Sequence, residues 1–111
     1  MKLVVTGKQR KSFTPLHRTK LSQAAMMILG PGQASQEQSG NEHAWAEQWL
    51  YVVSGTGSAR VGKRTVKLRP RTLLLIERHE PHQITNTGRH SLVTLNVYAP
   101  PAYDKAGEPL R

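Results

Sequence analysis

Residues 48–68 read QWLYVVSGTGSARVGKRTVKL, and this stretch decides the fold. Its opening residues, 48–53, are rich in aromatic and β-branched side chains, which is typical of a β-strand. Ser54-Gly55-Thr56-Gly57 and Gly62-Lys63 then mark two tight turns, and each is followed by another short strand-like segment. The stretch therefore predicts three consecutive strands joined by hairpins.

Further strand signals lie on both sides of this centre. Residues 23–29, QAAMMIL, fit a short helix or a buried strand, and Gly30-Pro31-Gly32 ends the run. We expect a strand there, because the segments downstream are strand-like. Additional strands are expected at residues 73–76, 83–85 and 92–98. Regularly spaced short strands with no convincing helix predict an all-β sandwich or barrel.

Length and composition limit the function classes. The chain has 111 residues, the size of one domain, and contains no cysteine. Any metal must therefore be held by nitrogen and oxygen donors. No apolar run approaches the roughly 18 residues of a membrane-spanning helix, and charges rather than an apolar signal region follow residues 1–5. We expect a soluble cytoplasmic protein without a membrane partner.

The formal charge is strongly positive, at +9 from 16 Lys and Arg against 7 Asp and Glu. Such a charge attracts partners that carry phosphate or carboxylate groups. The basic residues are nevertheless spread along the chain, and the alternation of Lys67, Arg69 and Arg71 is typical of the solvent face of a strand. A solvated basic surface is the prediction, nucleic acid is not the expected partner, and specific polyanion binding stays open as the alternative.

Two histidine-bearing segments flank the β-rich centre, NEHAWAEQ at residues 41–48 and PHQITN at residues 81–86. Together with the hairpin glycines and the turn Asn86-Thr87-Gly88, they resemble the two motifs of the cupin family over residues 28–103. The resemblance implies an all-β fold, a single-domain jelly-roll barrel of the kind also called a double-stranded β-helix. With the cupin barrel expected at 23–103, the basic and polar residues 1–22 are read as an arm or edge strand, and residues 104–111 as a tail.

The resemblance also implies that several side chains bind one divalent transition metal ion. The candidates for this ion are Fe, Ni, Zn, Mn, Co and Cu. His43, Gln48 and His82 occupy ligand positions of the two motifs. Gln48 stands where cupins carry an acidic ligand and Asn41 where they carry a further histidine, whereas His82 matches in spacing and type. Because an amide supplies only a neutral oxygen, Glu42 is the expected fourth ligand, if a bulge turns it inward.

Some alternatives remain open at these positions. Glu47 becomes the metal ligand in place of Gln48 only if the strand register slips by one residue, since neighbouring residues on a strand face opposite sides. Gln48 can instead be a core residue that orients His43 through a hydrogen bond. In the second motif, Glu77 replaces the usual proline and His79 the usual glycine. His79 is read as a surface residue, as are His17 and His90.

A small-molecule pocket is expected at the mouth of the barrel. Trp45 lies two residues from His43, where it can wall a pocket, and Leu50 and Asn86 are the other expected pocket residues. The ligand is a small molecule, and the basic composition is compatible with an anionic one.

Two function classes follow. The first is a metal-dependent enzyme, an oxygenase, isomerase or decarboxylase, and the second is a non-catalytic module that binds or senses a small ligand. No general acid or base stands out to decide the reaction. We also expect a homodimer, because single-domain cupins commonly pair and residues 3–6 can complete the sheet edge of a neighbour.

Overall fold

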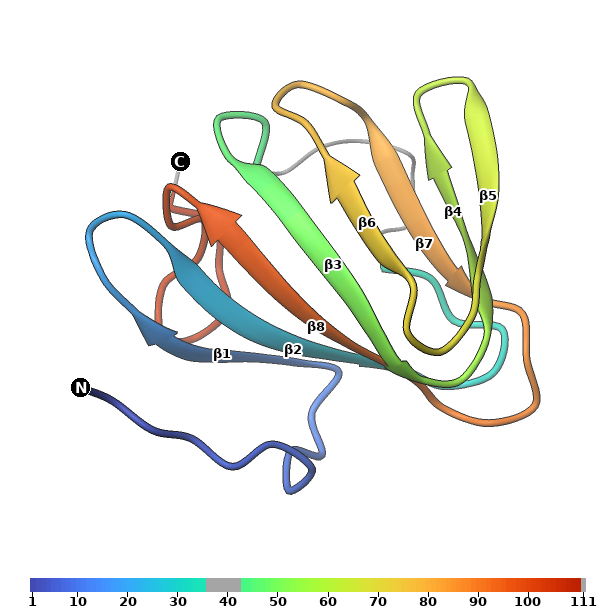
Figure 1. The fold of residues 1–111 in the computed structure, drawn as a ribbon, viewed down its shortest axis with the longest axis horizontal. Coiled ribbons are helices and arrows are strands. Elements are labelled where there is room, and N and C mark those ends of the chain that lie inside the picture. Colours follow the sequence, from blue (N-terminus) through green and yellow to red (C-terminus); the bar gives the residue numbers. More distant parts are fainter. Residues whose placement is uncertain (36–42, 111) are drawn as a thin grey trace.

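The structure, a computed structural model, describes residues 1–35 and 43–110 (Figure 1). Within these ranges the chain forms eight strands and no helix. The strands are β1 (Phe13–Arg18), β2 (Gln23–Leu29), β3 (Glu47–Ser54), β4 (Gly57–Val61), β5 (Arg64–Leu68), β6 (Leu73–Ile76), β7 (His82–Asn86) and β8 (Leu92–Ala99). Residues 23–29, which fit helix or strand by sequence, are therefore a strand. No helical segment in the described part of the chain has the length and apolarity needed to cross a bilayer.

The strands form two antiparallel sheets. One has five strands in the order β1-β2-β8-β3-β6, and the other has three in the order β5-β4-β7. The isolated bridge between Ala34 and Thr85 adds the segment after β2 to the free side of β7. The all-β jelly-roll barrel predicted from the sequence is confirmed.

The two sheets enclose an apolar core. On β3, Leu50 and Val52 are fully buried whereas Tyr51 and Val53 are exposed, which is the alternation of a strand with one face inside the barrel. Burying each such aliphatic side chain contributes about 1.5–3 kcal/mol relative to exposure. The core members are Met27, Leu29, Leu50, Val52, Ala59, Leu68, Ile76, Ile84 and Leu92. Every strand from β2 to β8 thus contributes to one core.

Glycine is required at the turn between β3 and β4. Gly55 has φ 87°, in the left-handed region, and a Cβ built there would lie 2.8 Å from Cα of Leu92 and closer still to the carbonyl oxygen of Ser91. Only glycine satisfies both conditions. The turn predicted from the glycines of the opening stretch is therefore set by the approach of the chain to the start of β8.

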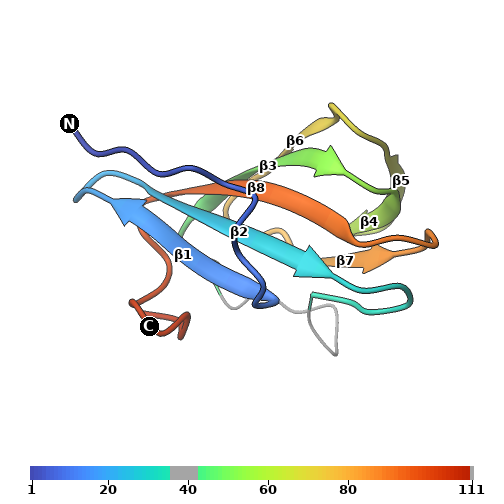
Figure 2. The same ribbon diagram turned by 90° about the horizontal axis from the view of Figure 1, so that it is seen from below.

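The N-terminal segment precedes β1 and crosses the outer face of the five-stranded sheet (Figure 2). Gly7, Gln9 and Arg10 line a pocket on that face together with Met26 and Ile28 of β2. Met26 points away from the core, yet only 2% of it is exposed because the arm covers it. Residues 3–6 are in no strand in this structure.

Candidate functional site

A cavity of about 420 Å³ lies inside the barrel, between the two sheets. Its polar lining comes from His43, Gln48 and His82, and its apolar lining includes Phe13 and Met27. Among the described residues that line it, none is Asp, Glu, Lys or Arg. The cavity therefore presents imidazole, amide and aromatic groups rather than formal charges.

Backbone hydrogen bonds bring the two histidines to the same end of the barrel. His43 begins a turn in which its own carbonyl oxygen accepts a hydrogen bond from the Ala46 amide at 2.9 Å. Strand β3 starts directly after this turn. The amide of His79 donates to the carbonyl of Ala44 at 3.0 Å, which fastens the β6–β7 loop to the turn. Since His82 is the first residue of β7, this bond holds the start of β7 close to the turn that carries His43.

The two imidazoles are in contact and almost fully buried. Their centroids are 4.9 Å apart with an interplanar angle of 47°. His43 also meets the ring of Tyr98 edge-on, at a centroid distance of 4.9 Å. Nδ1 of His82 lies 3.0 Å from the carbonyl oxygen of Glu80. Because a carbonyl only accepts, Nδ1 carries the hydrogen and Nε2 carries the lone pair, as in a metal-ligating histidine.

Gln48 is held by a line of buried polar groups. Its Nε2 donates to Oδ1 of Asn96 at 2.8 Å, and Nδ2 of Asn96 donates to Oγ1 of Thr94 at 3.0 Å. This arrangement leaves Oε1 of Gln48 buried and without a hydrogen-bond partner among the described residues. A buried oxygen without a partner costs about 1–3 kcal/mol, so its retention calls for a ligand, an ion or a water at this point.

The environment keeps His43 neutral. Burial lowers its pKa below the usual value of 6.5, and the neighbouring His82 lowers the pKa further. The backbone around His43 and the Gln48 side chain oppose the shift more weakly. The Gln48 side chain is thus close enough to His43 to raise its pKa, although Oε1 of Gln48 has no hydrogen-bond partner among the described residues. A neutral imidazole is the form that binds a metal.

The structure thus brings together His43, Gln48 and His82 from the predicted ligand set. Gln48 points inward, while the outward-facing Glu47 accepts a hydrogen bond from Nε1 of Trp49 at 3.0 Å. The strand register therefore has no slip at this point. Glu42, the expected fourth ligand, lies outside the described residues, as does Asn41.

The three predicted pocket residues lie elsewhere. Trp45 donates from Nε1 to the carbonyl of Pro101 at 3.2 Å and packs against a second apolar cluster. Leu50 is fully buried in the main core, one inward position deeper than Gln48. Asn86 donates to the carbonyls of Leu29 and His90, both at 2.8 Å, and so closes the β7–β8 turn. None of the three is among the described residues that line the cavity.

Two tyrosines that sequence reasoning did not assign to the site do line the cavity. Tyr98 shares the inward parity of Leu92 on β8, so strand alternation could have found it. Tyr103 lies beyond β8, and its position depends on the buried side chain of Gln23, which accepts from the Ala102 and Tyr103 amides and donates to the Tyr103 carbonyl. No local pattern signals this long-range clamp.

The described residues hold no group of three or more His, Cys, Asp or Glu side chains placed to bind a metal ion. The donor set of the site is two imidazoles and one amide oxygen. This set is neutral, and nitrogen and oxygen donors of this kind suit borderline divalent metals.

Comparison with known proteins identifies the family. Residues 25–98 match the family described as Cupin domain, and the chain belongs to the cupin family. No curated protein matches the chain.

Similar solved structures share the fold. BH2720 from Bacillus halodurans has a TM-score of 0.82 at 23% identity, over 94% of this chain and 85% of that one. TT1209 from Thermus thermophilus has a TM-score of 0.78 at 22% identity, over 90% and 98% of the two chains. The cupin domain of an XRE-family transcriptional regulator from Enterobacter cloacae has a TM-score of 0.68 at 20% identity, over 80% and 95%. At these identities the likeness extends to the fold alone.

Proposed function

We propose that the protein is a metal-dependent small-molecule cupin, in which His43, His82 and Gln48 hold a divalent transition metal in the barrel cavity. The observation that carries the proposal is the buried Oε1 of Gln48, which has no hydrogen-bond partner in the described residues, together with the effect of the Gln48 side chain on His43, whose ring contacts that of His82. A divalent ion would satisfy this oxygen and engage the lone pairs of neutral imidazoles.

The residues around the ion would fix its ligands before it binds. The carbonyl of Glu80 orients the His82 ring, and Asn96 holds the amide of Gln48 by its nitrogen so that the oxygen is presented. Such supporting contacts typically change metal affinity by about 10–100-fold. The site would therefore be organised in the protein itself rather than assembled by the metal.

The ligand class follows from charge. A divalent ion bound by neutral donors keeps its positive charge, and when bound it would polarise a coordinated carbonyl or carboxylate of the small molecule. An anionic oxygen ligand would neutralise that charge in the cavity, where Phe13, Met27 and Tyr98 offer apolar contact to the rest of the molecule. Oxygenation, isomerisation and decarboxylation are the reactions that this arrangement would serve.

A titration of the metal-stripped protein with Co²⁺ tests the proposal. Co²⁺ bound by imidazole gives visible absorption, which should saturate at about one ion per chain and disappear in His82→Ala. His90→Ala, at an exposed position away from the cavity, is the matched control and should retain the signal. A folded wild-type protein that gives no saturable absorption would refute the metal site.

A second candidate is a sensing module without turnover. It is favoured by the neutral lining of the cavity in the described residues and by the fold shared with a cupin domain of a transcriptional regulator. Both candidates require small-molecule binding. Chemical conversion of the bound molecule, followed by mass spectrometry, separates them, because a sensing module releases its ligand unchanged.

A further inference from the structure

A second pocket lies beside the edge strand β1, where segments that are distant in sequence meet. Its volume is about 330 Å³, and residues of the N-terminal segment, of β1, of β2 and of the segment after β8 line it. No described residue lines both this pocket and the barrel cavity. The pocket is therefore separate from the candidate metal site.

The permanently charged side chains that line this pocket are all cationic, and they are Lys2, Arg18 and Lys105. No Asp or Glu in the described part of the chain lines it. Asp104, which is next to Lys105, is engaged in its own turn, since its Oδ1 accepts from the amides of Ala106 and Glu108 at 2.8 and 3.0 Å. The pocket thus gathers positive charge without a counter-charge in its lining, and such a concave basic site attracts anions.

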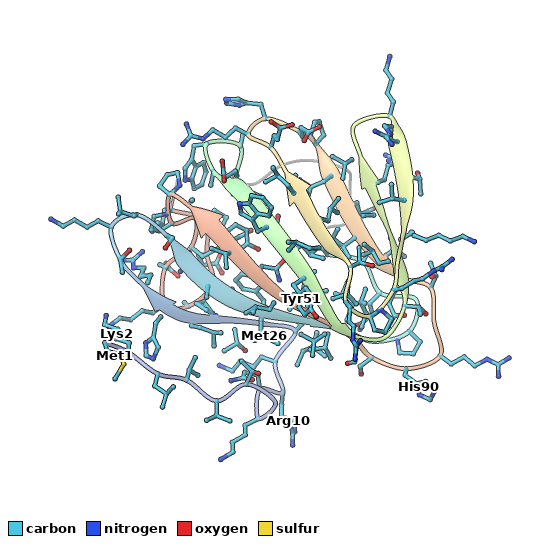
Figure 3. All side chains as sticks on the ribbon, in the orientation of Figure 1. Met1, Lys2, Arg10, Met26, Tyr51 and His90 are labelled. Atoms are coloured by element: carbon cyan, nitrogen blue, oxygen red, sulfur yellow. The ribbon has the colours of Figure 1, made fainter. Side chains whose placement is uncertain are left out.

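Hydrogen bonds hold the separate segments together around the pocket. Nε2 of His17 donates to the carbonyl oxygen of Leu3 at 3.1 Å, which fastens the segment that carries Lys2 to β1. Figure 3 labels Lys2 at the N-terminal end of this segment, below β1 in the view. Nη1 of Arg18 donates to the carbonyl oxygen of Tyr103 at 3.3 Å, which ties the end of β1 to the segment after β8. The cations therefore come together through tertiary contacts that no local run of basic residues would supply.

The three cations form a donor set that suits a phosphate group. Arg18 carries five N–H groups, and the bond to the backbone occupies one of them. A guanidinium can bind two oxygens of a phosphate at once, and each ammonium adds a compact charge with three donors. The side chains of Lys2, Arg18 and Lys105 are exposed, so an anion can reach them from solvent.

We propose that this pocket binds a phosphate group, either as the free ion or as part of a small phosphate monoester. A phosphate monoester carries about −1.5 to −2 charges at pH 7 and offers three acceptor oxygens, which match three cations better than a singly charged carboxylate does. Pro15 and Leu16 are half-buried and add apolar surface to the same pocket. Its volume lies at the lower end of the range of about 300–1,000 Å³ that is typical of small-molecule sites, so the organic part of a small monoester has room there.

Titration of the full chain with inorganic phosphate, followed by ¹⁵N NMR at constant ionic strength, tests the site. The amide signals of residues 16–18 and 104–105 should shift saturably, with a dissociation constant of roughly 1 mM. Phenyl phosphate is the second probe. Tighter binding of phenyl phosphate than of inorganic phosphate would identify a monoester site, and equal or weaker binding would identify a site for the free ion. Malonate carries a similar charge on two carboxylates and should bind about tenfold more weakly than phosphate.

Three variants separate local recognition from overall charge. Lys105→Gln removes one exposed cation and should raise the dissociation constant for phosphate about tenfold, with unchanged circular dichroism. Arg18→Lys keeps the charge but loses the planar fork, and should raise the constant about threefold to tenfold. Lys63→Gln, at an exposed lysine in the β4–β5 turn, which lies far from the N-terminus in Figure 1, is the matched control. It removes the same charge as Lys105→Gln and should leave the constant within about twofold of the wild type.

Several results would overturn the proposal. Without saturable shifts in the wild-type protein, there is no phosphate site. Equal weakening in Lys63→Gln and Lys105→Gln would show that overall charge, rather than this pocket, attracts the anion. Malonate binding as tight as that of phosphate would assign the pocket to carboxylates. Shifts that are confined to the barrel cavity and are lost in His82→Ala would place the phosphate on the proposed metal instead.

Discussion

The imidazole rings of His43 and His82 lie 4.9 Å apart in the barrel, one on the turn before β3 and the other at the start of β7. Two buried imidazoles in contact cannot both be protonated without a large electrostatic cost. Their proximity therefore favours neutral rings, and the lowered pKa of His43 agrees with this. The pair has the form required of metal ligands, and its proton-binding behaviour leads to the first prediction.

Stability should depend on pH through His43. Its pKa in the folded protein is below 6.5, so the unfolded chain binds a proton at a pH where the folded chain does not. The contribution of neutral His43 to the free energy of unfolding is therefore complete above pH 6.5. It is lost as the pH falls from 6.5 towards the pKa of His43 in the folded protein. Urea unfolding of the metal-stripped protein between about pH 7.5 and pH 5 should show this decline.

The matched variant for that experiment is His43→Gln, which removes the titrating group and should flatten the pH dependence. His17→Gln changes an exposed histidine and should leave the slope as in the wild type. An identical slope in His43→Gln and in the wild type would contradict the assignment of the pH effect to His43.

The contact between Gln48 and Asn96 should be energetically coupled. Asn96→Leu removes the acceptor of Gln48 Nε2 and also the donor to Thr94, so the free energy of unfolding should fall by about 1–3 kcal/mol. Gln48→Leu should cost a similar amount. In the double variant both polar partners are gone, and its loss should be smaller than the sum of the two single losses by about 1 kcal/mol.

Urea unfolding of the four proteins in this cycle gives the coupling free energy. Additive single losses would show that the two side chains are stabilised independently. The same variants tested for Co²⁺ binding separate folding from metal affinity, because Asn96→Leu removes a positioning contact while retaining the proposed ligands.

The glycine at the β3–β4 turn should tolerate no side chain. Gly55→Ala combines a positive φ with a Cβ that meets Ser91 and Leu92, and should lower the free energy of unfolding by more than about 3 kcal/mol. Gly62 also has a positive φ, of 59°, but no atom lies within 4 Å of the position that a Cβ would take there. Gly62→Ala should therefore cost only about 1–2 kcal/mol. Equal losses in thermal or urea unfolding would contradict the role of the Ser91 approach.

Much of the fold was predictable because it depends on local signals. Hairpin glycines and strand alternation indicated the strand positions. Alternation excluded that Gln48 and Glu47 both face inward, and the family motif, counted back from Gly55, favoured Gln48, which is the buried one. The depth of a side chain along the barrel has no such signal. Leu50 shares the inward face of Gln48 but lies deeper, in the apolar core, and Asn86 is inward but engaged in closing a turn.

The remaining site residues depend on long-range packing. Tyr103 reaches the cavity only because Gln23 binds the backbone after β8, and such a contact between distant segments leaves no periodic pattern. His79 shows how a family motif can be physically informative even where the residue differs. It occupies the usual glycine position and has φ 67°, the conformation that glycine adopts most easily.

The most direct test of the metal-dependent account is the metal content of the purified protein. Elemental analysis should find about one divalent transition metal ion per chain in the wild type, and little in His82→Ala, which lacks one of the two imidazoles. His90→Ala should match the wild type. A wild-type protein that is folded, contains no transition metal and takes none up on incubation with Co²⁺, Ni²⁺, Zn²⁺ or Fe²⁺ would contradict the account.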